Sequence, residues 1–117
     1  MYAIVIPNWQ PTTLNQLMGG HYMHAHKLKK SDAEMIGGYA RLARVPKAEG
    51  KRRVTLTITL VKRQRAGDPD CYWKSTLDGL VLAGMLRDDN RQNCELAPVG
   101  FARGKNRETT IYLEDLA

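Results

Sequence analysis

One segment, Val54–Val61, constrains the fold more than any other, because it alternates strictly between apolar residues and threonines as far as Leu60. Leu56, Ile58 and Leu60 share one face of an extended chain, and the three threonines share the other. A period of two in β-branched and large apolar residues is typical of a strand that buries one face. The segment therefore predicts a sheet with helices packed on one side.

The first half of the chain predicts one more strand and one helix. Tyr2–Ile6 is an apolar run rich in β-branched residues, so we expect a strand there. Residues 7–30 show no clean periodicity and are predicted to form an extended loop with short pieces of structure. A helix is expected to begin at Ser31, because Ser31 and Glu34 have the spacing of a capping box, and to end before Pro46.

The second half predicts a helix and two strands. The helix covers residues 70–84 and is closed by its terminal glycine. Residues 95–102 and 109–113 are predicted as strands joined in a hairpin through the turn at 104–106. The order β-α-β-α-β-β indicates one α/β (α+β) domain over residues 1–117: a small mixed sheet of about four strands with two helices packed on it.

Charge is distributed unevenly along the chain. Residues 1–26 carry no charged side chain apart from histidines, whereas residues 27–67 carry 12 basic and 3 acidic residues. Residues 68–117 carry 6 basic and 9 acidic residues, and the whole chain has a formal charge of +6. A cationic segment of this size favours a polyanionic partner such as nucleic acid.

The sequence also predicts a location. No apolar run approaches the roughly 18 residues of a membrane span, and the first residues lack the basic region of a signal peptide. Cys71 and Cys94 are too few for a disulfide framework. We therefore expect a cytoplasmic protein with reduced thiols and no membrane association.

Five aspartates follow the cationic segment within 22 residues: Asp68, Asp70, Asp78, Asp88 and Asp89. Carboxylates repel phosphates, so this cluster fits a nucleic-acid partner best if a divalent cation lies between the two. Oxygen ligands alone favour Mg²⁺ or Mn²⁺. The ordinary interpretations are that Asp68 caps the helix and that Asp88 and Asp89 form a turn.

A lysine lies within the same cluster. At 100° per residue, Asp70, Lys74 and Asp78 fall on one stripe of the predicted helix, and this stripe overlaps the apolar face. Charged side chains are seldom buried unless they are paired or bound, so the overlap suggests a polar cleft at the edge of the core. The alternative is a pair of ordinary surface ion pairs.

These residues resemble the RusA family of crossover (Holliday) junction endodeoxyribonucleases, which are small dimeric enzymes of bacteria and their phages. The family pattern has two aspartates separated by one residue, a lysine four residues later, an aspartate and a leucine at the helix centre, a glycine and a terminal pair of aspartates. The matching run in this chain is Asp68-Pro-Asp70-x3-Lys74-x3-Asp78-Gly-Leu80-x3-Gly84-x3-Asp88-Asp89.

The resemblance implies an activity and a site. Asp68, Asp70 and Asp89 would be the metal-binding catalytic carboxylates, and Lys74 would be the catalytic lysine. The implied enzyme is a homodimer that uses Mg²⁺ to make paired symmetric nicks in four-way DNA junctions, in a bacterial or phage-infected cytoplasm. Cys71 departs from the family pattern, which has an asparagine at that position.

The cationic segment would bind the DNA backbone through many phosphate contacts, which give affinity and salt dependence with little reading of sequence. The predicted DNA contacts are Lys29, Lys30, Arg52, Arg53, Lys62, Arg63 and Arg65. Two other functions stay open. One is a catalytically inactive DNA-binding module of the same fold, and the other is a toxin-like or phage structural interaction protein with an incidental basic surface.

Overall fold

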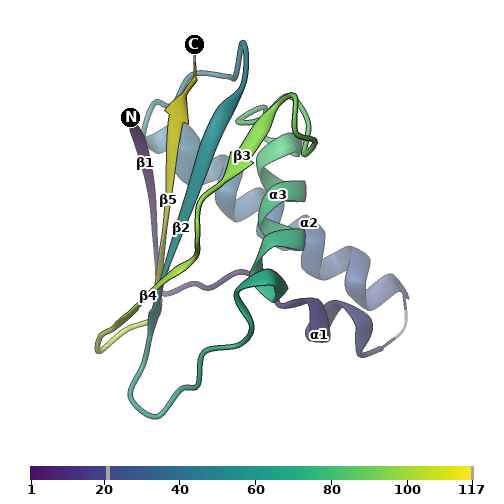
Figure 1. Cartoon of the computed structure of the whole chain (residues 1–117). Helices are drawn as coiled ribbons and strands as arrows, with labels where there is room; N and C mark the ends of the chain where they lie inside the picture. The colour runs from purple at the N-terminus through teal and green to yellow at the C-terminus, as the bar shows by residue number, and fades with distance from the viewer. Residues whose placement is uncertain (21, 117) are drawn as a thin grey trace.

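The computed structural model describes residues 1–20 and 22–116 (Figure 1). Over these residues the elements are β1 Tyr2–Pro7, α1 Leu14–Met18, α2 Tyr22–Leu42, β2 Arg52–Leu60, the 3₁₀-helix η1 Pro69–Tyr72, α3 Trp73–Leu82, β3 Cys94–Leu96, β4 Gly100–Arg103 and β5 Glu108–Asp115. The predicted class, a mixed sheet with helices packed on it, is confirmed; α1 and a fifth strand are additional. None of the described helices is long and apolar enough to cross a membrane.

β5 lies inside the sheet although it is the last strand in sequence. It pairs antiparallel with β1 on one side and with β2 on the other, which gives the order β1-β5-β2-β3 (Figure 1). In this register Ile111 lies between Ile4 and Leu56, and all three side chains are fully buried. The alternation of buried and partly exposed residues predicted for β2 is therefore confirmed. The buried residues of β1 and β5 lie on the same face of the sheet.

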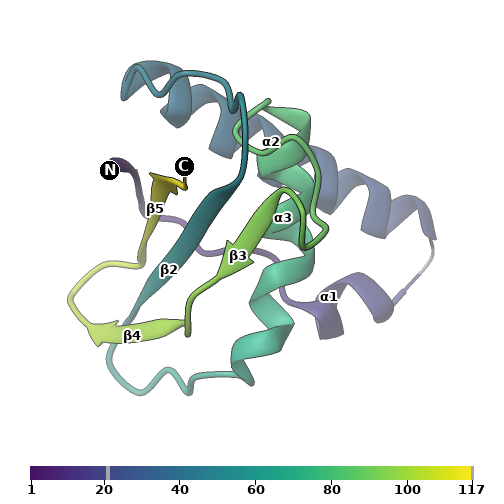
Figure 2. The same cartoon turned by 45° about the horizontal axis from the view of Figure 1, so that its top comes forward.

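The other edge of β2 carries two short strands. β3 pairs with the beginning of β2 and β4 with its end, and both run parallel to it (Figure 2). The predicted single strand over 95–102 and its hairpin with 109–113 are therefore wrong. Burial explains the difference, because Ile111 and Leu113 reach the core only beside β1 and β2, whereas the residues of β4 are largely exposed.

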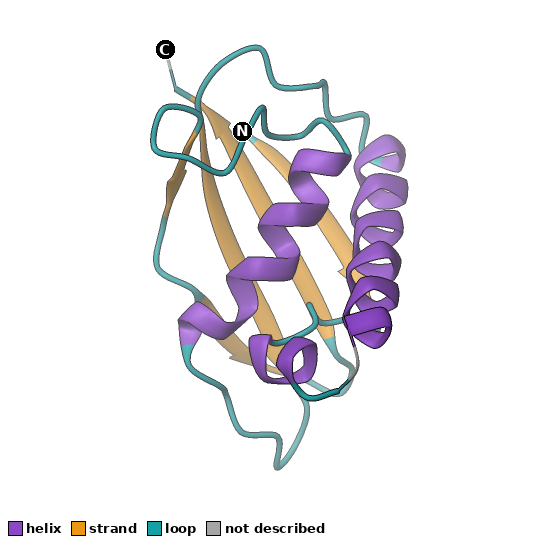
Figure 3. Cartoon of the chain, turned by 90° about the vertical axis from the view of Figure 1, so that its right-hand side faces the viewer, coloured by secondary structure: helices purple, strands orange, loops and turns teal. Residues whose placement is uncertain are grey.

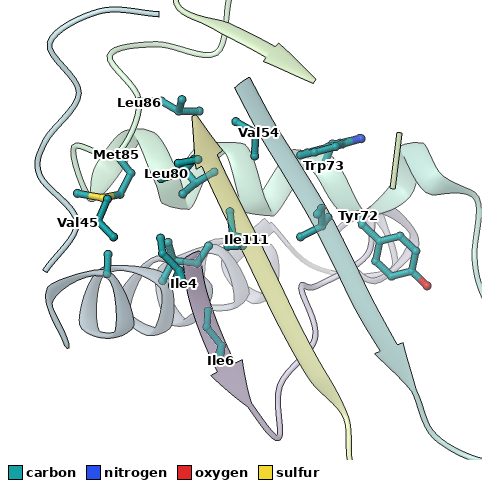
Figure 4. Packing of buried hydrophobic residues seen from close by; sticks show 14 of the residues in the cluster. Ile4, Ile6, Val45, Val54, Tyr72, Trp73, Leu80, Met85, Leu86 and Ile111 are labelled. Carbon is teal, nitrogen blue, oxygen red and sulfur yellow. The ribbon is translucent and has the colours of Figure 1, made fainter. Parts of the chain in front are cut away.

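The helices all lie on one face of the sheet (Figure 3). Apolar side chains fill the space between, with Val54 of β2 and Leu80 of α3 among those that meet there (Figure 4). Gly79 lets α3 lie close to α2, because a Cβ at this position would be 2.7 Å from Cδ1 of Ile36 and 3.3 Å from Cα of Ala33. The close packing of these two helices fixes α3 against α2.

α2 begins nine residues before its predicted start. Ser31 is exposed within the helix and does not cap it. Residues 22–30 contain no proline or glycine to stop the helix, and buried Ile36 and Ala40 anchor its second half against the core, so the capping motif is overridden. The end of the helix agrees better with the prediction, since Arg44 adopts a left-handed conformation (φ 57°) shortly before Pro46.

Arg52 is buried, which contradicts its predicted role as a DNA contact. Its side chain is 1% exposed, and its Nε donates to Oδ1 of Asp115 at 2.7 Å. Nη1 donates to the carbonyl of Met85 at 3.0 Å, and the guanidinium lies 5.3 Å from the ring centroid of Tyr2. Arg52 therefore connects β1, β5 and the segment after α3, and its hydrogen bond holds the pKa of Asp115 below the ordinary value.

Candidate active site

A polar hollow of about 1060 Å³ lies beside η1, and we call it the aspartate hollow. Two stretches of chain and one arginine form its walls: Asn8, Trp9, Gln10, Pro11, Thr13, Leu14, Asn15, Gln16, Gln64, Arg65, Gly67, Asp68, Pro69, Asp70, Cys71, Tyr72 and Arg107. The segment that joins β2 to η1 faces the segment that joins β1 to α1 (Figure 1). Asp68 and Asp70, two of the predicted catalytic residues, are thus brought together.

The loop that carries the two aspartates is held by its neighbours. Asp68 occupies the N-cap position of η1, and Pro69 follows as the first residue of the helix. The hydroxyl of buried Tyr72 accepts a hydrogen bond from the backbone N–H of Gly67 at 3.0 Å. The N-cap position of Asp68 agrees with the capping interpretation, but its side chain makes no capping hydrogen bond, so the carboxylate is not used to cap η1.

Four charged side chains in this hollow have no hydrogen-bond or ion-pair partner among the described residues. They are Asp68, Asp70, Arg65 and Arg107. Carboxylates provide the oxygen ligands that Mg²⁺ prefers, and guanidinium groups bind phosphate oxygens in pairs. The hollow therefore has two unpaired carboxylates that could bind a divalent cation and two unpaired guanidinium groups that could bind a phosphodiester.

Uncharged residues of the hollow wall were not predicted from the sequence. Gln10 and Gln64 exchange hydrogen bonds at 2.7 and 3.0 Å, and Gln10 also donates to the carbonyl of Thr59 at 2.9 Å. This pair joins the two walls of the hollow at one end. No sequence signal marks it, because its members lie 54 residues apart.

Cys71, which replaces the asparagine of the family pattern, also lines the hollow. Its thiol pKa is raised, mainly by burial and further by the negative charge of Asp68. Sγ lies 2.9 Å from the position that a Cβ on Gly67 would occupy, so the thiol is packed tightly against the loop. Cys71 therefore acts as a small packing residue beside the acids.

The predicted stripe of Asp70, Lys74 and Asp78 forms only in part. Nζ of Lys74 lies 3.7 Å from Oδ1 of Asp78, and Nζ of Lys29 lies 3.7 Å from the other oxygen of that carboxylate. The Lys74 side chain is 51% exposed, and Lys74 does not line the aspartate hollow. The ordinary interpretation, a surface ion pair, therefore describes Lys74 and Asp78 in this structure.

Asp89 lies beyond the opposite end of α3 from Asp68 and Asp70. The ten residues of α3 alone rise about 15 Å, and the segment that follows them lies at the far end of the helix (Figure 1). Asp88 forms the expected turn, accepting hydrogen bonds from the N–H of Asp89 at 2.8 Å and from Nδ2 of Asn90 at 3.2 Å. Among the described residues, no three His, Cys, Asp or Glu side chains could hold a metal ion together.

A second hollow, of about 730 Å³, lies between α2 and α3. Its lining mixes acidic and basic side chains: Glu34, Asp78, Asp88 and Asp89 with His26, Lys29, Lys30 and Arg41. Val81 and Leu82 line it as well, and Leu82 is 74% exposed. The predicted carboxylate set is thus divided between two hollows at the two ends of α3.

The remaining predicted DNA contacts lie in three places. The loop after β2 carries Lys62, Arg63 and Arg65, of which Arg65 lines the aspartate hollow. α2 carries two beside the second hollow: Lys29 and Lys30. Arg53 lies on the uncovered face of the sheet, where Glu114 and Glu95 lie 2.9 and 3.5 Å from its guanidinium.

No protein-family model matches this chain, and no curated protein matches it. The geometry of the aspartate hollow and the spacing of residues 68–89 are therefore the observations on which a function can be argued.

Proposed function

We propose that the chain is a Mg²⁺-dependent endodeoxyribonuclease of the RusA type that cuts four-way DNA junctions, with Mn²⁺ as a substitute metal. The observation that carries the proposal is the aspartate hollow, where Asp68 and Asp70 face the same space as Arg65 and Arg107 without being paired to them. The spacing of residues 68–89 supports it independently. The proposed location is a bacterial or phage-infected cytoplasm, where the two free cysteines would remain thiols.

The aspartate hollow provides two of the three carboxylates that the family resemblance implies. Mg²⁺ is commonly bound by one or two carboxylates, several waters and substrate phosphates, so Asp68 and Asp70 are sufficient protein ligands. When bound there, the ion would neutralise phosphate charge and lower the pKa of a bound water. Arg65 and Arg107 would hold the phosphodiester across the same hollow.

In the proposed enzyme, a second copy of the chain would bring its Asp89 to this site. Asp68 and Asp89 lie beyond opposite ends of α3, and an antiparallel pairing of two α3 helices brings the end of one beside the start of the other. The same pairing would move Lys74 toward the partner's helix and compete with its exposed ion pair to Asp78. We therefore assign Asp89 and Lys74 to a site shared by two chains of the proposed homodimer.

The first experiment tests the cleavage. A synthetic four-way junction is incubated with Mg²⁺ and the wild-type chain, Asp70→Asn or Glu49→Gln, the last being an exposed carboxylate outside both hollows. We expect symmetric nicks from the wild type and Glu49→Gln, and a loss of at least about a hundredfold in Asp70→Asn. Junction binding without Mg²⁺-dependent cutting by the wild type would refute the nuclease and leave a DNA-binding module.

A second experiment locates Asp89. Asp70→Asn and Asp89→Asn are each expected to be inactive alone, but unfolding and refolding them together should form mixed dimers. In each mixed dimer one of two shared sites keeps both aspartates, so roughly one quarter of all sites should nick DNA. If every site is built within one chain, the mixture stays inactive and the shared site is wrong.

A further inference from the structure

A buried carboxylate outside the proposed site connects its two walls. Asp32 lies in α2 and is 4% exposed. Its Oδ2 accepts a hydrogen bond from the backbone N–H of Thr12 at 2.8 Å and another from Oγ of Ser75 at 2.6 Å. Thr12 and Ser75 are themselves buried, so water does not compete strongly for either hydrogen bond.

Each donor lies next to a segment that lines the aspartate hollow. Thr12 precedes Thr13, which caps α1 in a complete capping box with Gln16, and Thr13 and Gln16 both line the hollow. Ser75 is in the first turn of α3, five residues after Asp70. One carboxylate oxygen therefore fixes the segment before α1 and the start of α3 relative to each other.

Asp32 is not paired with a basic side chain of the described residues. Within the described chain, no Lys, Arg or His lies within ion-pair distance of it, and both of its donors are neutral. Burying a carboxylate in such surroundings is costly compared with burying an amide. A carboxylate oxygen is, however, the stronger acceptor, and it shortens and aligns the hydrogen bonds that it receives.

We propose that Asp32 is a positioning residue that sets the separation between the α1 wall and the η1–α3 wall of the aspartate hollow. Its effect on cleavage rests on the proposed function, whereas its effect on the walls does not. Because Asp32 faces away from the solvent, it acts through Thr12 and Ser75 and does not touch DNA or metal.

Amide hydrogen exchange tests the effect on the walls. We compare wild type with Asp32→Ala, Asp32→Asn and Ser75→Ala, and use Thr76→Ala as a matched control. The Thr76 hydroxyl is also buried, but it donates to the Tyr72 carbonyl at 2.8 Å, four residues earlier in the continuous η1–α3 segment, and not to the segment before α1. Asp32→Ala should speed exchange of residues 12–18 about tenfold or more relative to β5, and Ser75→Ala should do so to a smaller degree.

The conservative variant separates positioning from general stability. An asparagine oxygen can accept both hydrogen bonds, so Asp32→Asn should restore slow exchange in residues 12–18. Unchanged exchange there in both Asp32→Ala and Ser75→Ala would overturn the proposal. Equal acceleration in Thr76→Ala, or equal acceleration of β5, would also overturn it.

Cleavage of a four-way junction supplies the second readout. If the walls separate, Asp32→Ala should raise KM and the Mg²⁺ concentration for half-maximal rate several-fold more than it lowers kcat, with Asp32→Asn close to wild type. Unchanged KM and Mg²⁺ requirement in an active Asp32→Ala variant would refute the positioning role. A wild type that never cleaves refutes the proposed nuclease, while the exchange data still decide the role of Asp32.

Discussion

Arg52 and Arg53 are neighbours in β2, but one is buried and the other is exposed. Replacing each with alanine therefore tests whether the residue stabilises the fold. Arg52 is buried and hydrogen-bonded to Asp115 and to the Met85 carbonyl. Arg53 is 39% exposed and pairs with Glu114 on the uncovered face of the sheet. The sequence predicts the same role for both residues, whereas the structure predicts different consequences.

The expected loss of folding stability in each variant follows from these contacts. Arg52→Ala removes one hydrogen bond to a carboxylate and one to a carbonyl, and leaves a space where the buried guanidinium was. Because the Asp115 side chain is 58% exposed, solvent screens the ion pair, and we expect a total loss of about 2–4 kcal/mol. Arg53→Ala removes exposed pairs and should cost less than about 1 kcal/mol.

Urea unfolding measures this difference. With a slope of about 1.5–2 kcal/mol per molar urea, Arg52→Ala should lower the unfolding midpoint by about 1–2.7 M, and Arg53→Ala by less than about 0.7 M. At a temperature where Arg52→Ala is still folded, it should bind a four-way junction as wild type does. Equal midpoints, or a folded Arg52→Ala with weakened DNA binding, would refute the assignment of this residue to the core.

Three further predictions concern DNA binding, helix packing and acid stability. Arg65→Ala and Arg107→Ala should each weaken junction binding several-fold and reduce the slope of log affinity against log salt by about one, as measured by fluorescence anisotropy; an unchanged slope would exclude a phosphate contact. Gly79→Ala should cost about 1–3 kcal/mol in urea unfolding, because the new methyl group overlaps Ile36; no loss would show that α2 and α3 separate freely. The pKa of Asp115 is lowered in the folded state, so its stabilising effect is complete above the unfolded pKa and lost as pH falls below about 4; Asp115→Asn should flatten this part of the stability curve, and an unchanged curve would contradict the hydrogen bond.

Local patterns in the sequence were sufficient to predict some parts of the fold and of the site. The alternation of Val54–Val61 predicted β2 and its buried face, and the Gly84 helix stop is confirmed by its left-handed φ of 78°. Asp68 and Asp70 meet in one hollow because a single residue separates them. These features depend on residues close in sequence, where periodicity and turn chemistry act directly.

The parts that the sequence did not predict depend on distant contacts. In the sequence, Arg52 cannot be told apart from the other basic residues. The pairing of β5 with β2 places Asp115 beside Arg52. Arg107 enters the aspartate hollow from a turn with no distinctive pattern. The position of Asp89 depends on the path after α3, which helical spacing cannot specify.

The central place of β5 has a consequence for how the protein is made. β1 is translated before the other strands but pairs only with β5 in the sheet, whose residues follow about a hundred positions later. During synthesis, Ile4 and Ile6 therefore remain without their sheet partner until nearly all of the described chain has been translated. Nascent chains stalled before Glu108 should expose this apolar strand and be substrates for chaperones that bind extended segments.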